Sequence, residues 1–130
     1  MNAPDGPNND GIIIDSSRNV VIEDCTLNTR EDCIALKSGL NEDGRRVGKP
    51  TENVIVRRTR ATGGAGGITI GSDMSGGVRN VFVHDCHYDG PSAGMFRLQF
   101  GSRPMGRDEN ADLMGRLQRE KIVGLAVATP

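Results

Sequence analysis

Short runs in which apolar and polar residues alternate recur along the first hundred residues of this chain. Three of the runs begin after an asparagine, at Asn19, Asn53 and Asn80. Their alternate apolar positions are Val20/Ile22, Val54/Val56 and Val81/Val83. Because a period of two residues is typical of a strand with one buried face, each run predicts a β-strand rather than a helix.

A second set of apolar positions recurs 15 or 16 residues after each asparagine, and once more near the start of the chain. These positions are Ile12, Ile34, Ile68 and Phe96, followed two residues later by Ile14, Leu36, Ile70 and Leu98. The residues two places before each pair are spaced by 22, 34 and 28 residues (10 to 32, 32 to 66, 66 to 94). We take 22 residues as the bare repeat. The longer spacings are then insertions in two polar, glycine-rich loops, Ser38–Thr51 and Gly71–Val78.

Such a repeat predicts an all-β fold, a right-handed parallel β-helix of about four rungs over residues 1–100. Successive rungs would stack about 4.8 Å apart, so that equivalent apolar residues form continuous columns. An antiparallel sandwich also consists of short strands, but it does not explain columns that keep their register. Both ends of a short solenoid expose unpaired strand edges, so we expect self-association through these ends.

The repeat stops after Gly101, and residues 101–130 form a divergent tail. Within it, residues 108–120 read DENADLMGRLQRE and place Ala111, Leu113, Met114 and Leu117 at helical spacing. This spacing predicts a helix over 108–120, followed by a terminal strand in the apolar segment IVGLAVATP. A helix there would cover the open end of the solenoid, while an unrelated tail is the alternative.

The amino-acid composition and charge exclude some classes of function. The 130 residues contain 16 Lys+Arg and 17 Asp+Glu, a balance that argues against a nucleic-acid partner. No apolar segment is long enough to span a membrane, and the first residues show no signal peptide. Cys25, Cys33 and Cys86 are expected to be free thiols, because Cys25 and Cys86 fall two rungs apart and too far for a disulfide.

Acidic residues stand just before two of the strands. Asp10 and Asp32 occupy the same column on adjacent rungs, and Glu31 is next to Asp32. Three carboxylates this close cannot all ionise readily, so at least one retains its proton above the usual pKa. A protonated acid beside a carboxylate is what glycosidic hydrolysis requires. Turn residues that cap local N–H groups are the alternative, and Arg97, two rungs away, favours the site by offering a partner for an acidic sugar.

Four segments, NNDG, REDCIALKSG, GGAGGITIGSDMSGGVRNV and FRLQ, together resemble the polygalacturonase family of pectin-degrading glycoside hydrolases. The resemblance covers residues 2–100, and the loop EDGRRVGKPTENV looks like that of bacterial members. It implies a right-handed parallel β-helix that cleaves α-linked galacturonate with inversion and without a metal or other cofactor. Asp10 and Asp32 would activate water, Glu31 would protonate the leaving oxygen, and Arg97 would hold the substrate carboxylate.

The resemblance further implies that substrate is bound by Gln99, Asn9, Gly66 and Gly67, and that the partner is an acidic polysaccharide. The chain departs from the family at three positions. Glu31 replaces an aspartate, Ala65 a histidine and Gln99 a lysine. We therefore expect a hydrolase of much reduced activity, with a non-catalytic module that binds acidic polysaccharide as the alternative. Because the first motif lies almost at Met1, we expect a fragment or truncated relative, whose full-length form is secreted or periplasmic.

Overall fold

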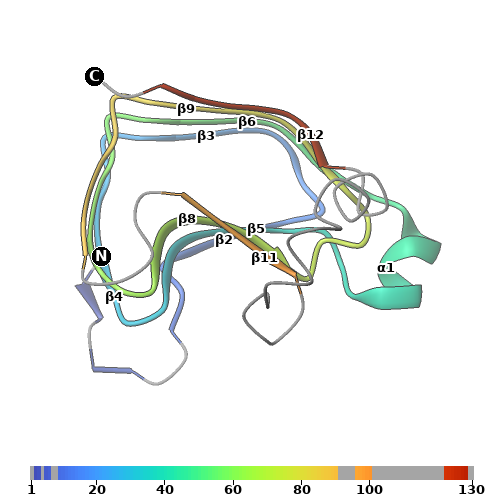
Figure 1. The fold of residues 1–130 in the computed structure, drawn as a ribbon, viewed down its shortest axis with the longest axis horizontal. Helices are drawn as coiled ribbons and strands as arrows, with labels where there is room; N and C mark the ends of the chain where they lie inside the picture. The colour runs from blue at the N-terminus through green and yellow to red at the C-terminus, as the bar shows by residue number, and fades with distance from the viewer. Residues whose placement is uncertain (1, 4, 7–8, 91–95, 101–121, 129–130) are drawn as a thin grey trace, which may run out of the picture.

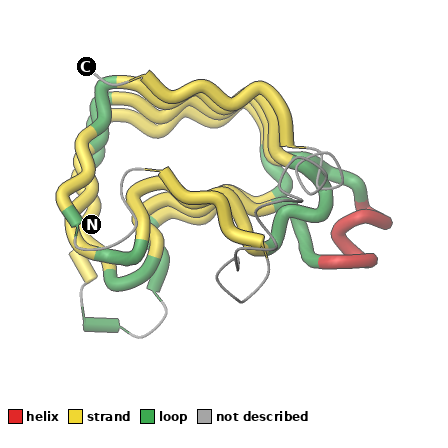
Figure 2. The backbone as a smooth tube through the Cα atoms, viewed as in Figure 1, coloured by secondary structure: helices red, strands yellow, loops and turns green. Residues whose placement is uncertain are grey.

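The computed structural model describes residues 2–3, 5–6, 9–90, 96–100 and 122–128. Within them, the strands form three parallel sheets of four strands each (Figures 1 and 2). Sheet A contains β1 (Asn2–Ala3), β4 (Thr26–Thr29), β7 (Arg60–Gly63) and β10 (His87–Asp89). Sheet B contains β2 (Ile12–Asp15), β5 (Asp32–Lys37), β8 (Gly66–Ser72) and β11 (Phe96–Phe100). Sheet C contains β3 (Arg18–Glu23), β6 (Thr51–Arg57), β9 (Val78–His84) and β12 (Ile122–Ala128).

The three sheets are the sides of a stacked coil, which confirms the predicted parallel β-helix. In Figure 1, sheets B and C face each other, sheet A closes one side, and helix α1 (Asn41–Val47) lies at the opposite end. The predicted columns are present as strand register. Ile12 pairs with Ile34, Ile34 with Ile68 and Phe96 with Ile68, while Ile14, Leu36, Ile70 and Leu98 form the neighbouring column.

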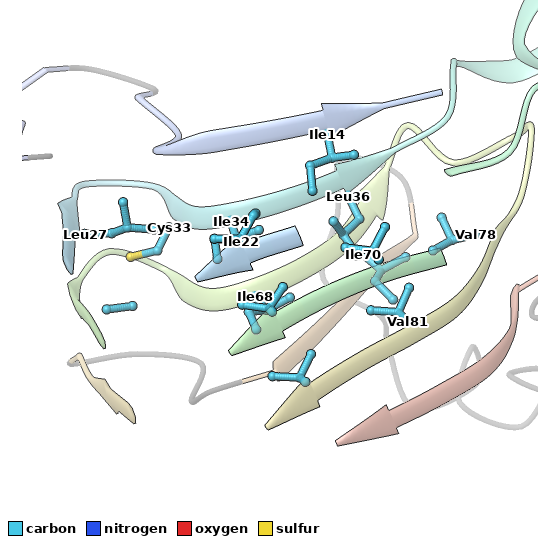
Figure 3. Packing of buried hydrophobic residues seen from close by; sticks show 14 of the residues in the cluster. Ile14, Ile22, Leu27, Cys33, Ile34, Leu36, Ile68, Ile70, Val78 and Val81 are labelled. Carbon is cyan, nitrogen blue, oxygen red and sulfur yellow. The ribbon is translucent and has the colours of Figure 1, made fainter. Parts of the chain in front are cut away.

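The core fills the space between sheets B and C with aliphatic side chains (Figure 3). Leu36 and Ile70 from sheet B, and Val54 and Val56 from sheet C, are completely buried. Each such side chain stabilises the fold by roughly 1.5–3 kcal/mol relative to an exposed one. Ile14, Leu36, Ile70 and Leu98 contribute the same inward position from four successive strands, so the core supports sheet B from its inner side.

Sheet A was not anticipated from the sequence as a separate set of strands. Its strands β4, β7 and β10 have 4, 4 and 3 residues, too few to show alternation. Their inward residues are Leu27 and Ala61, which are buried, and Tyr88, which packs against the core.

The asparagines that precede the sheet C strands stack into a ladder. Asn19, Asn53 and Asn80 have φ angles of 59°, 55° and 54°, in the left-handed region that asparagine tolerates better than most residues. Asn53 Nδ2 donates to Asn19 Oδ1 at 3.0 Å, and Asn80 Nδ2 donates to Asn53 Oδ1 at 3.1 Å. The aligned asparagines of the sequence are therefore the residues that bend each rung in the same way.

The predicted loop Ser38–Thr51 contains α1, a helix that the sequence analysis did not anticipate. Its first turn carries Glu42 and Asp43 and its last turn Arg45 and Arg46, charges that suit the two ends of a helix dipole. Gly48 ends the helix in the left-handed conformation and donates its N–H to the carbonyl of Gly44. Seven residues are too few for an apolar periodicity to appear in the sequence.

The tail adds a strand to the stack. β12 pairs with β9 in parallel, with Ile122 opposite Val78 and Leu125 opposite Val81, so the repeat resumes after the point where the sequence pattern ended. The predicted helix over 108–120 lies outside the described residues. No helix in the described part of the chain is long and apolar enough to cross a membrane. Cys25, Cys33 and Cys86 are free thiols, as predicted.

Candidate active site

Three carboxyl groups meet at the corner where sheet A passes into sheet B. Asp10 precedes β2, Glu31 lies between β4 and β5, and Asp32 begins β5. The backbone fixes their relation, because the Asp32 N–H donates to Asp10 Oδ1 at 3.3 Å and the Gly11 N–H donates to the Asp32 carbonyl at 2.9 Å. All three acids line one open cleft of about 280 Å³ on the outer side of the coil. The structure thus brings together the acids that the sequence pattern had placed side by side.

Asp32 is the most enclosed of these acids. Its side chain is 10% exposed, and its Oδ1 lies 3.7 Å from the Arg97 guanidinium without receiving a hydrogen bond from a described residue. Burial raises the pKa of the Asp32 carboxyl, and the negative charges of Asp10 and Glu31 raise it further. The neighbouring Thr69 hydroxyl and Arg97 act in the opposite direction, although the Thr69 hydroxyl does not meet hydrogen-bond geometry with Oδ1.

A glycine beside Asp32 makes room for its carboxylate. Gly66 pairs with Asp32 in the strand register. A methyl group on Gly66 would lie 2.8 Å from Thr69 Oγ1 and 3.2 Å from Asp32 Oδ1. Gly66 therefore supports the position of the catalytic candidate. Gly67, also expected to bind substrate, is buried in β8 and is not among the residues that line the cleft.

The remaining predicted residues divide between cleft and support. Gln99 lines the cleft from β11. Asn9 is not a lining residue of the cleft; its side-chain oxygen accepts the Arg30 N–H at 3.2 Å and its carbonyl accepts the Glu31 N–H at 3.4 Å. Asn9 thus holds the segment that presents Glu31. Ala65 is joined to Glu31 through the backbone, because the Glu31 carbonyl accepts the Ala65 N–H at 3.1 Å.

One charged group that lines the cleft, Lys37 at the end of β5, was not predicted from the sequence. Its Nζ lies 3.6 Å from Asp10 Oδ2, and its side chain is 23% exposed. The signal available in the sequence was weak, because Lys37 is five residues beyond Asp32 and 27 residues beyond Asp10, a spacing that does not indicate a contact. Gly71 and Ser72 complete the wall of the cleft.

This arrangement suits acid–base chemistry on an anionic ligand. Asp32, whose carboxyl keeps its proton to a higher pH than usual because its pKa is raised, lies in one cleft with Asp10 and Glu31, and neighbouring carboxyl groups of this kind are required to protonate a leaving group and to activate water. Lys37 and Arg97 place positive charge on the two sides of the acids.

Comparison with known proteins places this geometry in a family. A probable polygalacturonase of Vitis vinifera is 44% identical over 80 residues, which are 61% of this chain and 16% of that protein. A probable polygalacturonase of Arabidopsis thaliana is 38% identical over 99 residues, which are 72% of this chain and 19% of that protein. The chain thus spans less than a fifth of the length of these curated relatives. Both come from plants and give no support to the expectation of a bacterial-type protein.

A solved structure agrees with these relatives. The crystal structure of a hyperthermoactive exopolygalacturonase from Thermotoga maritima matches with a TM-score of 0.62 and 30% identity. The match covers 77% of this chain and 30% of that one. The model of glycosyl hydrolases family 28 matches residues 1–98, and this chain belongs to that family.

Proposed function

We propose that the cleft hydrolyses α-galacturonide bonds of pectin with inversion, using its three carboxyl groups. The observation that carries the proposal is the meeting of Asp10, Glu31 and Asp32 in one outward-facing cleft, with Arg97 beside them. The family and its polygalacturonase relatives support the choice of substrate. Pectin is an extended polyanion, and Lys37 and Arg97 are the cations beside the acids that would contact its carboxylates.

In the proposed reaction Glu31 gives its proton to the glycosidic oxygen as the bond from that oxygen to the anomeric carbon breaks. Asp10 and Asp32 hold a water molecule on the opposite face of the sugar and remove one of its protons as its oxygen attacks. The net change is one water consumed and one glycosidic bond cleaved, with Glu31 left as a carboxylate and one base protonated. Subsequent proton exchange with water restores the starting state.

Arg97 would bind the carboxylate of the sugar. The guanidinium carries five N–H donors, and its described ion pair with Asp32 engages Nη1 at 3.7 Å. Planar guanidinium and carboxylate groups form paired hydrogen bonds, which orient the sugar as well as hold it. An arginine on the outer face of β11, partly exposed and next to the acids, can contact the acids and the ligand together.

The raised pKa of Asp32 has a direct consequence for the proposed base. A base acts only when ionised, and Asp32 loses its proton at a higher pH than an ordinary aspartate. We therefore expect turnover to increase as pH rises through the pKa of Asp32, so that the acidic limb of the pH–rate profile is set by this residue.

Two departures from the family should slow the reaction. Glu31 extends the acid by one C–C bond, about 1.5 Å, and a displacement of about 1 Å can cost about 100-fold in rate. Ala65 offers only a methyl group beside Glu31 where the family has histidine. We accordingly expect slow release of reducing ends from polygalacturonate, at mildly acidic pH and without added calcium.

The test compares the unmodified chain with two variants. Glu31→Gln should abolish the release of reducing ends, because an amide has no proton to give at this pH. The triple variant Glu31→Asp, Ala65→His, Gln99→Lys should increase it, since it restores the position of the acid, its neighbour and a cation. No turnover by the correctly folded triple variant would rule out hydrolysis by this chain.

The identities of Glu31, Ala65 and Gln99 favour a second candidate, a non-catalytic module that binds acidic polysaccharide. Under this alternative, polygalacturonate binds to the cleft both before and after Glu31→Gln, and the triple variant releases no reducing ends. Binding and turnover assays on the same three proteins therefore separate the two functions.

A further inference from the structure

Lys37 has a position in the cleft that the acid–base chemistry does not account for. Its side chain leaves the end of β5 and returns toward Asp10, where Nζ and Oδ2 are 3.6 Å apart. This distance is longer than the 2.7–3.2 Å of an N–H···O hydrogen bond, so the contact is an ion pair without a close donor–acceptor geometry. A lysine amine has three N–H donors, and here it is held over the cleft with only 23% of its side chain exposed.

The strand register relates Lys37 to Gln99. Lys37 pairs with Asp15 of β2. On the other side of β5, Leu36 pairs with Ile70, so Gly71 lies opposite Lys37 in the same register. Gly71 pairs in turn with Gln99 of β11. Lys37 and Gln99 therefore occupy one outward column, two strand steps or about 9.6 Å apart, and both line the cleft.

Gly71, the residue between them, carries no side chain. A methyl group there would overlap the carbonyl oxygen of Gln99, and φ of Gly71 is 106°, which side chains rarely tolerate. The column thus has a long cation at one position, a gap at the next and a neutral amide at the third. Because a lysine side chain reaches about 6 Å, an amine at either end of this column can approach a ligand lying over the gap.

We propose that Lys37 is a specificity-determining residue that binds the carboxylate of the galacturonate, supplying the positive charge that Gln99 lacks. The inference rests on the proposed function, since it assigns a role toward the same substrate. Lys37 and Arg97 then flank the acids, and an anionic sugar lies between two cations. An ammonium–carboxylate contact in a partly enclosed cleft is worth more than one in open solvent.

The competing role for Lys37 is purely internal, the neutralisation of Asp10. The two roles differ in what they demand of the ligand. A lysine that binds a substrate carboxylate discriminates between the acid and its methyl ester, whereas one that only balances Asp10 affects both ligands equally. The esterified sugar therefore serves as the control ligand.

The experiment measures equilibrium binding by titration calorimetry, with the full chain in a Glu31→Gln background to prevent turnover. The ligands are trigalacturonate and its trimethyl ester. Lys37→Gln should weaken binding of the acid about tenfold and binding of the ester less than twofold. Lys49→Gln removes the same charge from an exposed position outside the cleft and should change neither affinity. Thermal melting followed by circular dichroism confirms that each variant is folded.

A second-site substitution gives the sharper test. Adding Gln99→Lys to Lys37→Gln should recover most of the lost affinity for the acid, since the amine then approaches from the other end of the column. Equal losses for acid and ester, or no recovery in the double variant, would overturn the assignment. No binding of either ligand when Lys37 is present would overturn it together with the proposed substrate. Selective binding of the acid without turnover by the unmodified chain would retain Lys37 and reject only hydrolysis.

Discussion

Replacing Asp32 by asparagine should make the protein more stable while removing its proposed base. The Asp32 carboxylate is buried with an Oδ1 that receives no hydrogen bond from a described residue, and its raised pKa shows that the fold disfavours the charge. Asparagine has nearly the same shape and no charge. Its backbone N–H still donates to Asp10 Oδ1.

Two opposing contributions to the free energy of unfolding set the expected change in stability of Asp32→Asn. Leaving a buried polar group without its partner costs about 1–3 kcal/mol, and asparagine removes the charged part of that cost. Losing the 3.7 Å ion pair with Arg97 costs up to about 1 kcal/mol. We expect a net gain of about 1 kcal/mol in the free energy of unfolding at neutral pH, or about 4 °C in the melting temperature.

The gain should depend on pH with a defined sign. Because the pKa of Asp32 is higher in the folded than in the unfolded chain, the folded state binds more protons between the two values, and stability falls as pH rises through that window. Below an unfolded pKa of about 3.9, Asp32 is protonated in both states. The advantage of asparagine should therefore be small near pH 3 and complete above the folded pKa.

Urea unfolding followed by circular dichroism at several pH values between 3 and 7 measures this difference. Asp15→Asn is the matched control, because Asp15 is exposed and loses the same charge without relief of burial. An Asp32→Asn protein less stable than the unmodified one at pH 7, or a gain independent of pH, would refute the reasoning.

Three further predictions concern the stack itself. Leu36→Ala should lower the free energy of unfolding, measured with urea, by about 2–5 kcal/mol, because Leu36 is fully buried. Ile13→Ala on the exposed face should lower it by less than about 0.5 kcal/mol, and similar losses for the two variants would contradict the assigned faces. Asn53→Ala should lower the free energy of unfolding by about 2 kcal/mol, because it removes the amide ladder and places alanine at a left-handed φ. Asn53→Gly should lower it less, because glycine tolerates that φ, and equal falls in melting temperature for the two variants would argue against backbone strain. Gly71→Ala should lower the free energy of unfolding, measured with urea, by more than about 2 kcal/mol, because the added methyl group would overlap the Gln99 carbonyl. A smaller loss would contradict the close approach of these two residues.

The stacked columns could be predicted from sequence because a parallel coil gives each position the same neighbours on every rung. Ile34 must resemble Ile68 since the two touch, and the repeat of residue types therefore reports the register directly. The same reasoning found Asp10 and Asp32 together, as adjacent positions of one column. The expected roles of these acids came from the resemblance to the family motifs, because composition and spacing alone do not specify a function.

Features that depend on the path of a single side chain or on a short element escaped prediction. Lys37 reaches Asp10 from the far end of β5, a contact of one long side chain that the spacing of the two residues in the sequence does not indicate. Helix α1 has only seven residues, in which no apolar period can develop, and its recognisable features are the charges of its two ends and Gly48 just after it. The terminal strand was predicted from its apolar segment, but its place beside β9 was not, because β12 begins more than twenty residues beyond the end of β11 and outside the regular spacing.

The corner between sheets B and C varies in length from rung to rung without changing the coil. It consists of two residues between β2 and β3, thirteen between β5 and β6, and five between β8 and β9 (16–17, 38–50 and 73–77). Yet Arg18, Glu52 and Arg79 remain in register beyond it. The entropy of closing a thirteen-residue loop instead of a two-residue loop differs by only about 1.7 kcal/mol. An evolving or engineered chain can therefore lengthen, shorten or exchange these segments at small thermodynamic cost, and so diversify the surroundings of the cleft while the coil that carries the acids is inherited unchanged.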